Sequence, residues 1–234
     1  MGEPAPGAPV GVTEATPDAH PHEFYREVAR VALTVAGPHR FVLGGGVAWA
    51  AHGLVTRPTE DVDLFADVEG AAAAAAADVR TALERAGFEV ADADPDSDLG
   101  DLFDGFDRDL RDFVVGRDER RIRLSLARLD RHRSPVVMDL GPVMDVRDLI
   151  ANKTAALVNR REVRDYIDVA SALEHRSVAE LLELARQLDP ALDDDDVRAA
   201  GRYLDRIPDA RFTRYGLGPA DIVQVRRHLA AWPR

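Results

Sequence analysis

The stretch from residue 41 to residue 65, FVLGGGVAWAAHGLVTRPTEDVDLF, constrains the fold of this 234-residue chain more than any other. A short apolar run meets three consecutive glycines, and a helix-like run follows. A second apolar strand then carries Asp61 and Asp63. Because side chains on a strand alternate between its two faces, both carboxylates point to the same face.

Asp61 and Asp63 lie roughly 7 Å apart along an extended strand, a separation at which like charges repel. A strand interior is a poor place for aspartate, and a bound divalent cation would relieve the repulsion because hard cations prefer oxygen ligands. The alternative is a solvated strand end. The glycines also have two interpretations, a tight turn or a backbone that approaches a phosphate and offers it N–H groups.

The composition restricts the class of protein. With 46% apolar residues the chain can build a substantial core, and without cysteine it forms neither disulfides nor cysteine-ligated zinc sites. No apolar run is long enough for a membrane helix, and the N-terminus lacks the pattern of a secretory signal. We therefore expect a cytoplasmic protein with no membrane partner.

The net charge of −12 lies in the first 150 residues, because residues 151–234 carry 14 basic and 14 acidic side chains. An acidic half argues against a broad nucleic-acid groove, which needs a basic face. It leaves room for a local contact with an RNA end.

Hydrophobic periodicity predicts an α+β fold in three parts: a disordered tail (1–22), a core with a mixed sheet (23–144) and a C-terminal helical bundle (145–234). The expected strands cover 41–43, the segment around Asp61 and Asp63, 88–90, 110–115, 121–127 and 136–138. The expected helices cover 23–36, 47–54, 69–86, 146–158, 162–174, 177–188, 193–204 and 219–231. An acidic loop is expected at 92–109, and Gly141 with Pro142 marks the break before the bundle.

A second group of charged residues occupies the C-terminal helices. Lys153 falls on an apolar stripe (146, 149, 150 and 157), where a lysine is unexpected. It either extends along the surface until its ammonium reaches water or points at a phosphate. On the next helix, the spacing of four residues predicts surface ion pairs Arg161–Asp165 and Arg164–Asp168, each worth a few tenths of a kcal/mol.

The two groups together resemble a known family. The order strand, Gly-Gly, helix, Arg-x-Thr and Asp-x-Asp strand is similar to the nucleotidyltransferase superfamily of DNA polymerase β type. Within it, the chain resembles the AbiEii/AbiGii toxin family, which adds a helical lysine and an Arg-Asp-x-x-Asp segment. The residues that carry the resemblance are Gly45, Gly46, Ala48, His52, Gly53, Arg57, Thr59, Asp61 and Asp63, then Lys153, Arg161, Arg164, Asp165 and Asp168.

The resemblance implies a polymerase β-like nucleotidyltransferase that transfers NMP from an NTP to a tRNA or protein acceptor. It also implies Mg²⁺ as cofactor and a role as the toxin of a type IV-like pair, with a cognate antitoxin as partner. The implied metal ligands are Asp61 and Asp63. The implied nucleotide-binding residues are Gly45, Gly46, Arg57, Thr59 and Lys153. The implied catalytic residues are Asp61, Asp63, Lys153 and Asp165.

One departure concerns the third carboxylate that the superfamily commonly places on a later strand. Ser125 stands where the acid is expected, and Asp130, Asp139 or Asp165 could replace it. Two other functions stay open. One is a nucleotidyltransferase that modifies a small molecule such as an antibiotic, and the other is a non-catalytic nucleotide-binding or interaction protein on the same fold. Lys153 and the Arg-Asp segment favour the toxin family over the antibiotic-modifying enzymes.

Overall fold

The computed structural model describes residues 21–54, 59, 61–93 and 109–234, which form a seven-stranded mixed sheet with helices on both faces. The strands are β1 (Val42–Leu43), β2 (Asp61–Ala66), β3 (Glu89–Asp92), β4 (Leu110–Arg117), β5 (Arg120–Arg128), β6 (Val136–Met138) and β7 (Gly141–Val143). The helices are α1 (Pro21–Ala36), α2 (Gly45–Ala51), α3 (Ala71–Arg85), α6 (Val146–Arg160), α7 (Val163–Ala172), α8 (Val178–Leu188), α9 (Asp194–Leu204), α10 (Asp209–Thr213) and α11 (Pro219–His228), with short 3-10 turns η1 (Gly37–His39) and η2 (Leu229–Ala231).

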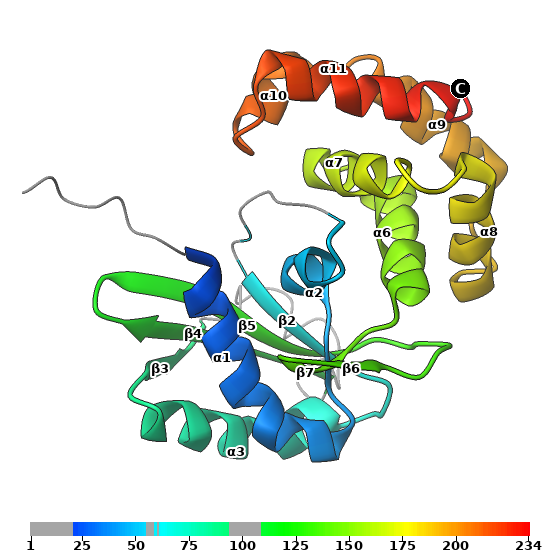
Figure 1. Cartoon of the computed structure of the whole chain (residues 1–234). Helices are drawn as coiled ribbons and strands as arrows, with labels where there is room; N and C mark the ends of the chain where they lie inside the picture. Colours follow the sequence, from blue (N-terminus) through cyan, green and yellow to red (C-terminus); the bar gives the residue numbers. More distant parts are fainter. Residues whose placement is uncertain (1–20, 55–58, 60, 94–108) are drawn as a thin grey trace, which may run out of the picture.

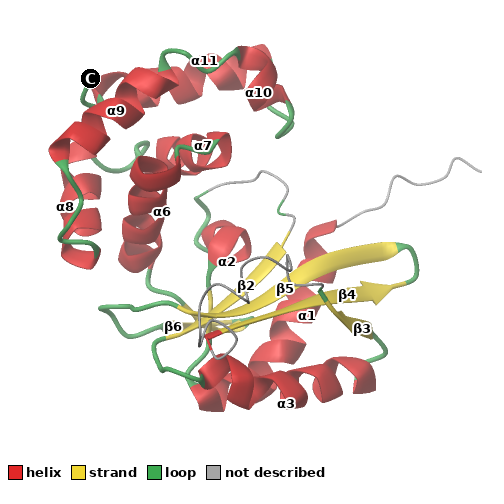
Figure 2. Ribbon diagram, turned by 180° about the vertical axis from the view of Figure 1, so that it is seen from behind, coloured by secondary structure: helices red, strands yellow, loops and turns green. Residues whose placement is uncertain are grey.

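The sheet has the order β3-β4-β5-β2-β1-β7-β6. β2 pairs in parallel with β5 and antiparallel with β1, and β1 pairs in parallel with β7. Helices α1 and α3 lie together on one face of the sheet, whereas α2 and the C-terminal helices lie on the other (Figure 1, Figure 2). The α+β class with a mixed sheet, predicted from the sequence, is confirmed.

The alternation predicted for the Asp-x-Asp strand is present in β2. Val62 and Leu64 are fully buried, whereas Asp61 and Asp63 lie partly buried on the opposite face. That face is the one covered by α2, which packs directly on β2. The two carboxylates therefore lie between the sheet and the helices that follow it in the chain.

The prediction was wrong at two places. Residues 141–143, taken as the break before the bundle, form β7 instead, which pairs with both β1 and β6. A three-residue strand that contains Pro142 has no alternating pattern, and it is defined only by long-range pairing with β1. Helix α10 was not predicted either; it has five residues, and its single buried side chain is Phe212.

The capping residues explain where the C-terminal helices begin. Asp145 accepts a hydrogen bond from the backbone N–H of Arg147 at the start of α6, and Ser177 with Glu180 forms a reciprocal capping box on α8. Buried hydrophobic side chains form one cluster, whose members extend in the sequence from Phe24 to Trp232. The boundary between a core domain and a helical domain at 144/145 stays a prediction. The predicted tail and the acidic loop fall almost entirely outside the described residues.

Candidate active site

The glycine turn packs directly on the Asp-x-Asp strand. The backbone N–H of Gly44 donates to the carbonyl of Asp63 at 2.8 Å. Gly45 has a positive φ of 57°, and a Cβ at this position would lie 1.8 Å from Oδ2 of Asp63. Any side chain there would therefore displace the carboxylate as well as strain the backbone. The close contact is with the Asp63 carboxylate, and approach of this backbone to a phosphate stays a prediction.

Thr59 lies under the same turn. It is buried, with 3% of its surface exposed, and a Cβ on Gly46 would come within 2.7 Å of its methyl group. Its hydroxyl oxygen is buried and has no hydrogen-bond partner. The structure thus places Gly45, Gly46 and Thr59 together. Arg57, the remaining residue of this predicted set, lies outside the described residues.

A cleft of about 280 Å³ opens between the sheet and the C-terminal helices. Lys153 and Arg164 of the second predicted group meet the glycine turn and the Asp-x-Asp strand there, whereas Asp165 lies buried behind the lining residues. The cleft is lined by Gly45, Gly46, Asp61, Asp63, Phe65, Leu129, Met144, Leu149, Asn152, Lys153, Ala156, Arg160, Arg164 and Tyr215. Five of these residues (149, 152, 153, 156 and 160) follow helical spacing, so one face of α6 forms a wall of the cleft.

The electrostatics of the cleft also connect the two groups. Burial, followed by the charge of Asp61, raises the pKa of Asp63 from 3.8 to about 6. Lys153 and Arg164 partly offset this rise, so both cations act on Asp63 from the helical side. A carboxylate with this environment is stabilised in its charged form by any cation that binds beside it.

Lys153 points into the protein and not along the surface. Its ammonium lies 2.8 Å from Oδ2 of Asp168 and 3.8 Å from Oδ1 of Asp165, and 14% of its side chain is exposed. The interpretation in which Lys153 extends to water is therefore wrong. Its ammonium stays in the cleft wall because two carboxylates of α7 hold it there.

The surface ion pairs predicted for this region are also wrong. Asp165 and Asp168 are both fully buried. Asp165 accepts two hydrogen bonds of 2.8 Å from the guanidinium of Arg160, which does not belong to the predicted pairs. The physical reason is the packing of α6 against α7, which buries the side of α7 that carries the two aspartates.

The arginines of the predicted pairs have other partners. Arg161 pairs with Asp196, and Arg164 contacts Glu162. Arg161 has a positive φ of 57° and ends α6, so it does not share a helix with Asp165. The rule for side chains four residues apart on one helix therefore does not apply to Arg161 and Asp165.

Two of the three aspartates considered as the third carboxylate are more exposed than the two carboxylates of β2. Asp130 and Asp139 are exposed and do not line the cleft, and Asp139 pairs with Arg26 on α1. Ser125 on β5 lies opposite Asp63 and, on its other side, opposite Asp112 of β4.

Asp112 was missed by the sequence analysis. One of its carboxylate oxygens pairs with Arg123, and the other is buried without a hydrogen-bond partner. Asp112 contributes to the raised pKa of Asp63, and only the strand register could have revealed this proximity.

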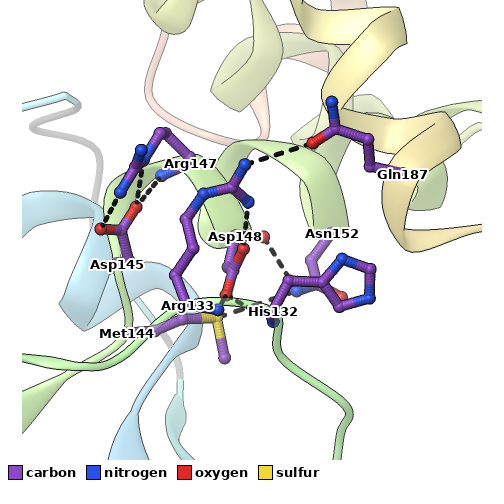
Figure 3. Close-up of polar contacts among 8 residues, drawn as sticks. All are labelled: His132, Arg133, Met144, Asp145, Arg147, Asp148, Asn152 and Gln187. Atoms are coloured by element: carbon purple, nitrogen blue, oxygen red, sulfur yellow. Dashed lines mark hydrogen bonds and ion pairs between the residues drawn. The ribbon is translucent and has the colours of Figure 1, made fainter.

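A buried aspartate fixes α6 beside the sheet (Figure 3). Asp148 accepts hydrogen bonds from the backbone N–H groups of His132 and Arg133 at 2.9 and 2.8 Å, and from the Arg133 side chain at 2.6 Å. The same guanidinium reaches Gln187 of α8 at 3.2 Å. The segment after β5, α6 and α8 are thus joined at one point, which holds the lysine-bearing face of α6 against the cleft.

Two further contacts hold the glycine turn in register with the helices. His52, at the end of α2, contacts the carbonyl oxygen of Met144 at 2.9 Å. Trp49 donates from its indole to the hydroxyl of Ser171 on α7 at 3.0 Å. These bonds give His52, one of the residues of the family resemblance, a structural role.

Asp61 and Asp63 have the chemistry of ligands for a hard divalent cation. Their oxygen donors suit such an ion, and the pKa of Asp63 is raised partly by repulsion that a cation would relieve. Within the described ranges, no group of three or more histidine, cysteine, aspartate and glutamate side chains is arranged to hold a metal.

Comparison with known proteins agrees with this geometry. The family model for the nucleotidyl transferase AbiEii toxin of a type IV TA system matches residues 28–228. No curated protein matches the chain significantly. In the described part of the chain, no helix is both long and apolar enough to cross a membrane.

Two solved structures share the fold. JHP933 from Helicobacter pylori is 16% identical, with a TM-score of 0.56 over 89% of this chain and 89% of that chain. MenT4, a nucleotidyltransferase toxin from Mycobacterium tuberculosis H37Rv, is 18% identical, with a TM-score of 0.56 over 88% of this chain and 82% of that chain. The family match confirms the resemblance found in the sequence: the chain belongs to the AbiEii family of nucleotidyltransferase toxins of type IV toxin–antitoxin systems.

Proposed function

We propose that this enzyme transfers the nucleoside monophosphate of an NTP to an oxygen of a tRNA or protein acceptor and releases pyrophosphate. The observation that carries the proposal is the shared cleft. Asp61 and Asp63 from β2, the turn at Gly45 and Gly46, and Lys153 from α6 all line it. Carboxylates, close-approaching backbone and an inward lysine are the groups that phosphoryl transfer uses, since its catalysis is mostly positioning and electrostatics.

The proposed cofactor is Mg²⁺ on Asp61 and Asp63. When bound, the ion lowers the pKa of the acceptor oxygen and stabilises negative charge on the departing pyrophosphate. The protein contributes the position of the two carboxylates. The backbone N–H of Gly44 binds the main-chain carbonyl of Asp63, and the absence of a side chain at Gly45 leaves room for the Asp63 carboxylate.

The remaining residues act on the substrates. Gly45, Gly46 and Thr59, with Arg57, would position the triphosphate, and Lys153 would neutralise part of its charge. Asp165 would orient the acceptor or act as a base by its family resemblance. Because Arg160 binds both carboxylate oxygens of Asp165, we assign Asp165 the orienting role, which it exerts through Arg160 and Lys153.

Incubation of the full chain with each radiolabelled NTP, Mg²⁺ and a cell extract tests the proposal. The expected result is label on a macromolecule with one or two of the four NTPs, and no label with Asp63→Asn. Sensitivity of the label to ribonuclease or to protease identifies the acceptor class. Label that appears only on small molecules would favour the antibiotic-modifying alternative, and nucleotide binding without transfer would favour the non-catalytic one.

The proposed setting is the cytoplasm, with a cognate antitoxin as partner, as the toxin–antitoxin description of the family suggests. Controlled expression of the wild-type chain should arrest growth. The Asp63→Asn variant at equal abundance should not. Growth arrest by both proteins would separate the toxicity from the transfer reaction and contradict this part of the proposal.

A further inference from the structure

Among the described residues, three cations line the cleft, and two of them are bonded to buried carboxylates. Lys153 forms its ion pairs with Asp165 and Asp168. Arg160 directs two of its N–H groups at Asp165. Each of these two residues is thus paired with a buried carboxylate, and Asp165 is a partner of both.

Arg164, the third cation, differs from the other two. Its Nε lies 2.7 Å from a carboxylate oxygen of Glu162, but that nitrogen is buried and makes no hydrogen bond. The contact is therefore an ion pair in which the N–H is not directed at the oxygen. Throughout the described residues, no hydrogen bond joins any donor of this guanidinium to another group, although it lines the cleft. An arginine has five N–H donors, and the buried Nε–H of Arg164 lacks a directed acceptor, which is unfavourable, while its side chain as a whole is 32% exposed.

We propose that Arg164 binds the triphosphate of the nucleotide, in addition to the glycine turn and Lys153. This inference rests on the proposed function, which supplies the triphosphate. Arg164 lines the same cleft as Gly45 and Asp63, so its side chain borders the part of the site where phosphate would lie. A planar guanidinium binds two phosphate oxygens at once, which a lysine does not do. The ligand supplies the acceptors that Arg164 lacks within the protein.

The charges in the cleft support the same assignment. Asp165 and Asp168 form ion pairs with Arg160 and Lys153. Of the cations that line the cleft in the described part of the chain, Arg164 is the one whose ion-pair partner does not belong to the buried carboxylates. Its partner Glu162 is 45% exposed in its side chain, so that pair is screened by water.

Binding of tripolyphosphate to the full-length chain in the presence of Mg²⁺, measured by calorimetry, tests the inference. Arg164→Gln should weaken binding by about 10- to 100-fold, the range for loss of hydrogen bonds to a charged group. Arg164→Lys keeps the charge without the planar fork and should lie between Arg164→Gln and the wild type. Arg161→Gln is the matched control, because Arg161 pairs with Asp196 and does not line the cleft. It should bind tripolyphosphate as the wild type does.

Two outcomes would overturn the inference. One is no binding of tripolyphosphate by the wild type, and the other is equal affinity of wild type and Arg164→Gln for tripolyphosphate. If that equal affinity came with a raised KM for the acceptor, Arg164 would be placed on the acceptor. Binding that depends on Arg164, in a chain that transfers no nucleotide, would refute the proposed function and leave the inference standing. Circular dichroism of each variant establishes that it is folded.

Discussion

Substitution of Gly45 by alanine should reduce transfer activity far more than it reduces the stability of the fold. Two penalties add at this position. A residue with a Cβ at φ 57° costs about 1–2 kcal/mol in the left-handed region. The new Cβ would also lie 1.8 Å from Oδ2 of Asp63, and overpacking of this kind costs about 1–3 kcal/mol while the carboxylate moves away.

Gly70 offers a matched control for the first penalty alone. It has a φ of 75°, precedes α3 on the other side of the sheet, and has no atom within 4 Å of an added Cβ. Gly70→Ala should therefore lose about 1–2 kcal/mol and keep full transfer activity. Gly45→Ala should lose a further ~1–3 kcal/mol, which lowers Tm by roughly 2–4 °C per kcal/mol in a chain of this length.

The assay combines urea denaturation with transfer of labelled nucleotide by the folded protein. The expected result is a loss of at least about 100-fold in transfer for Gly45→Ala, because a shift of about 1 Å in a reacting group can cost that much. Equal stability and equal activity of the two alanine variants would refute the reasoning. It would mean that the turn and Asp63 separate readily and that their contact has no functional role.

The remaining predictions concern the carboxylates of the cleft. Asp61→Asn and Asp63→Asn should each abolish metal-dependent transfer while circular dichroism stays unchanged, and wild-type transfer rates in either would exclude the metal site. Because the pKa of Asp63 is raised from 3.8 to about 6, the native state binds this proton more tightly than the unfolded state does. Stability of the metal-free protein should therefore fall by up to ~3 kcal/mol as the pH rises from about 4 to 6, and Asp63→Asn should remove that dependence in urea titrations. Asp168→Asn should lower the free energy of unfolding by about 3–5 kcal/mol, because it leaves Lys153 poorly paired. Adding Lys153→Met should recover part of that free energy, and strictly additive losses would contradict the pairing.

Local patterns in the sequence were sufficient to predict most of the helices and strands. The alternation around Asp63 predicted a strand with one buried face, and the caps at Asp145 and Ser177 predicted helix starts that the structure confirms. These signals work because each depends on residues a few positions apart. Strand β7 had no such signal, since its neighbour β1 is about 100 residues earlier in the chain and the pairing alone defines it.

The environment of a charged side chain could be predicted only where the neighbouring residues in the sequence already implied that it was buried. Asp112 and Asp148 have ordinary sequence surroundings, and their roles arise from strand register and from contacts between distant segments. Composition gives no indication that Asp148 is 1% exposed and bound by backbone N–H groups. Both residues became visible once the sheet order and the position of α6 were known.

Lys153 and the two aspartates of α7 show which kind of sequence anomaly is informative. A lysine on an apolar stripe and carboxylates on a packed helix each have an unremarkable explanation when considered alone, because lysine can extend to water and Asp–Arg pairs are common on helix surfaces. The two explanations fail together in the structure: the buried carboxylates of α7 are the groups that keep the lysine of α6 inside. Mutual neutralisation is what permits either set to be buried, since an unpaired charge would be strongly unfavourable there. Unexpected charges of opposite sign on neighbouring helices should therefore be assessed as a set, and here the set holds Lys153 in the lining of the cleft that Asp61 and Asp63 share.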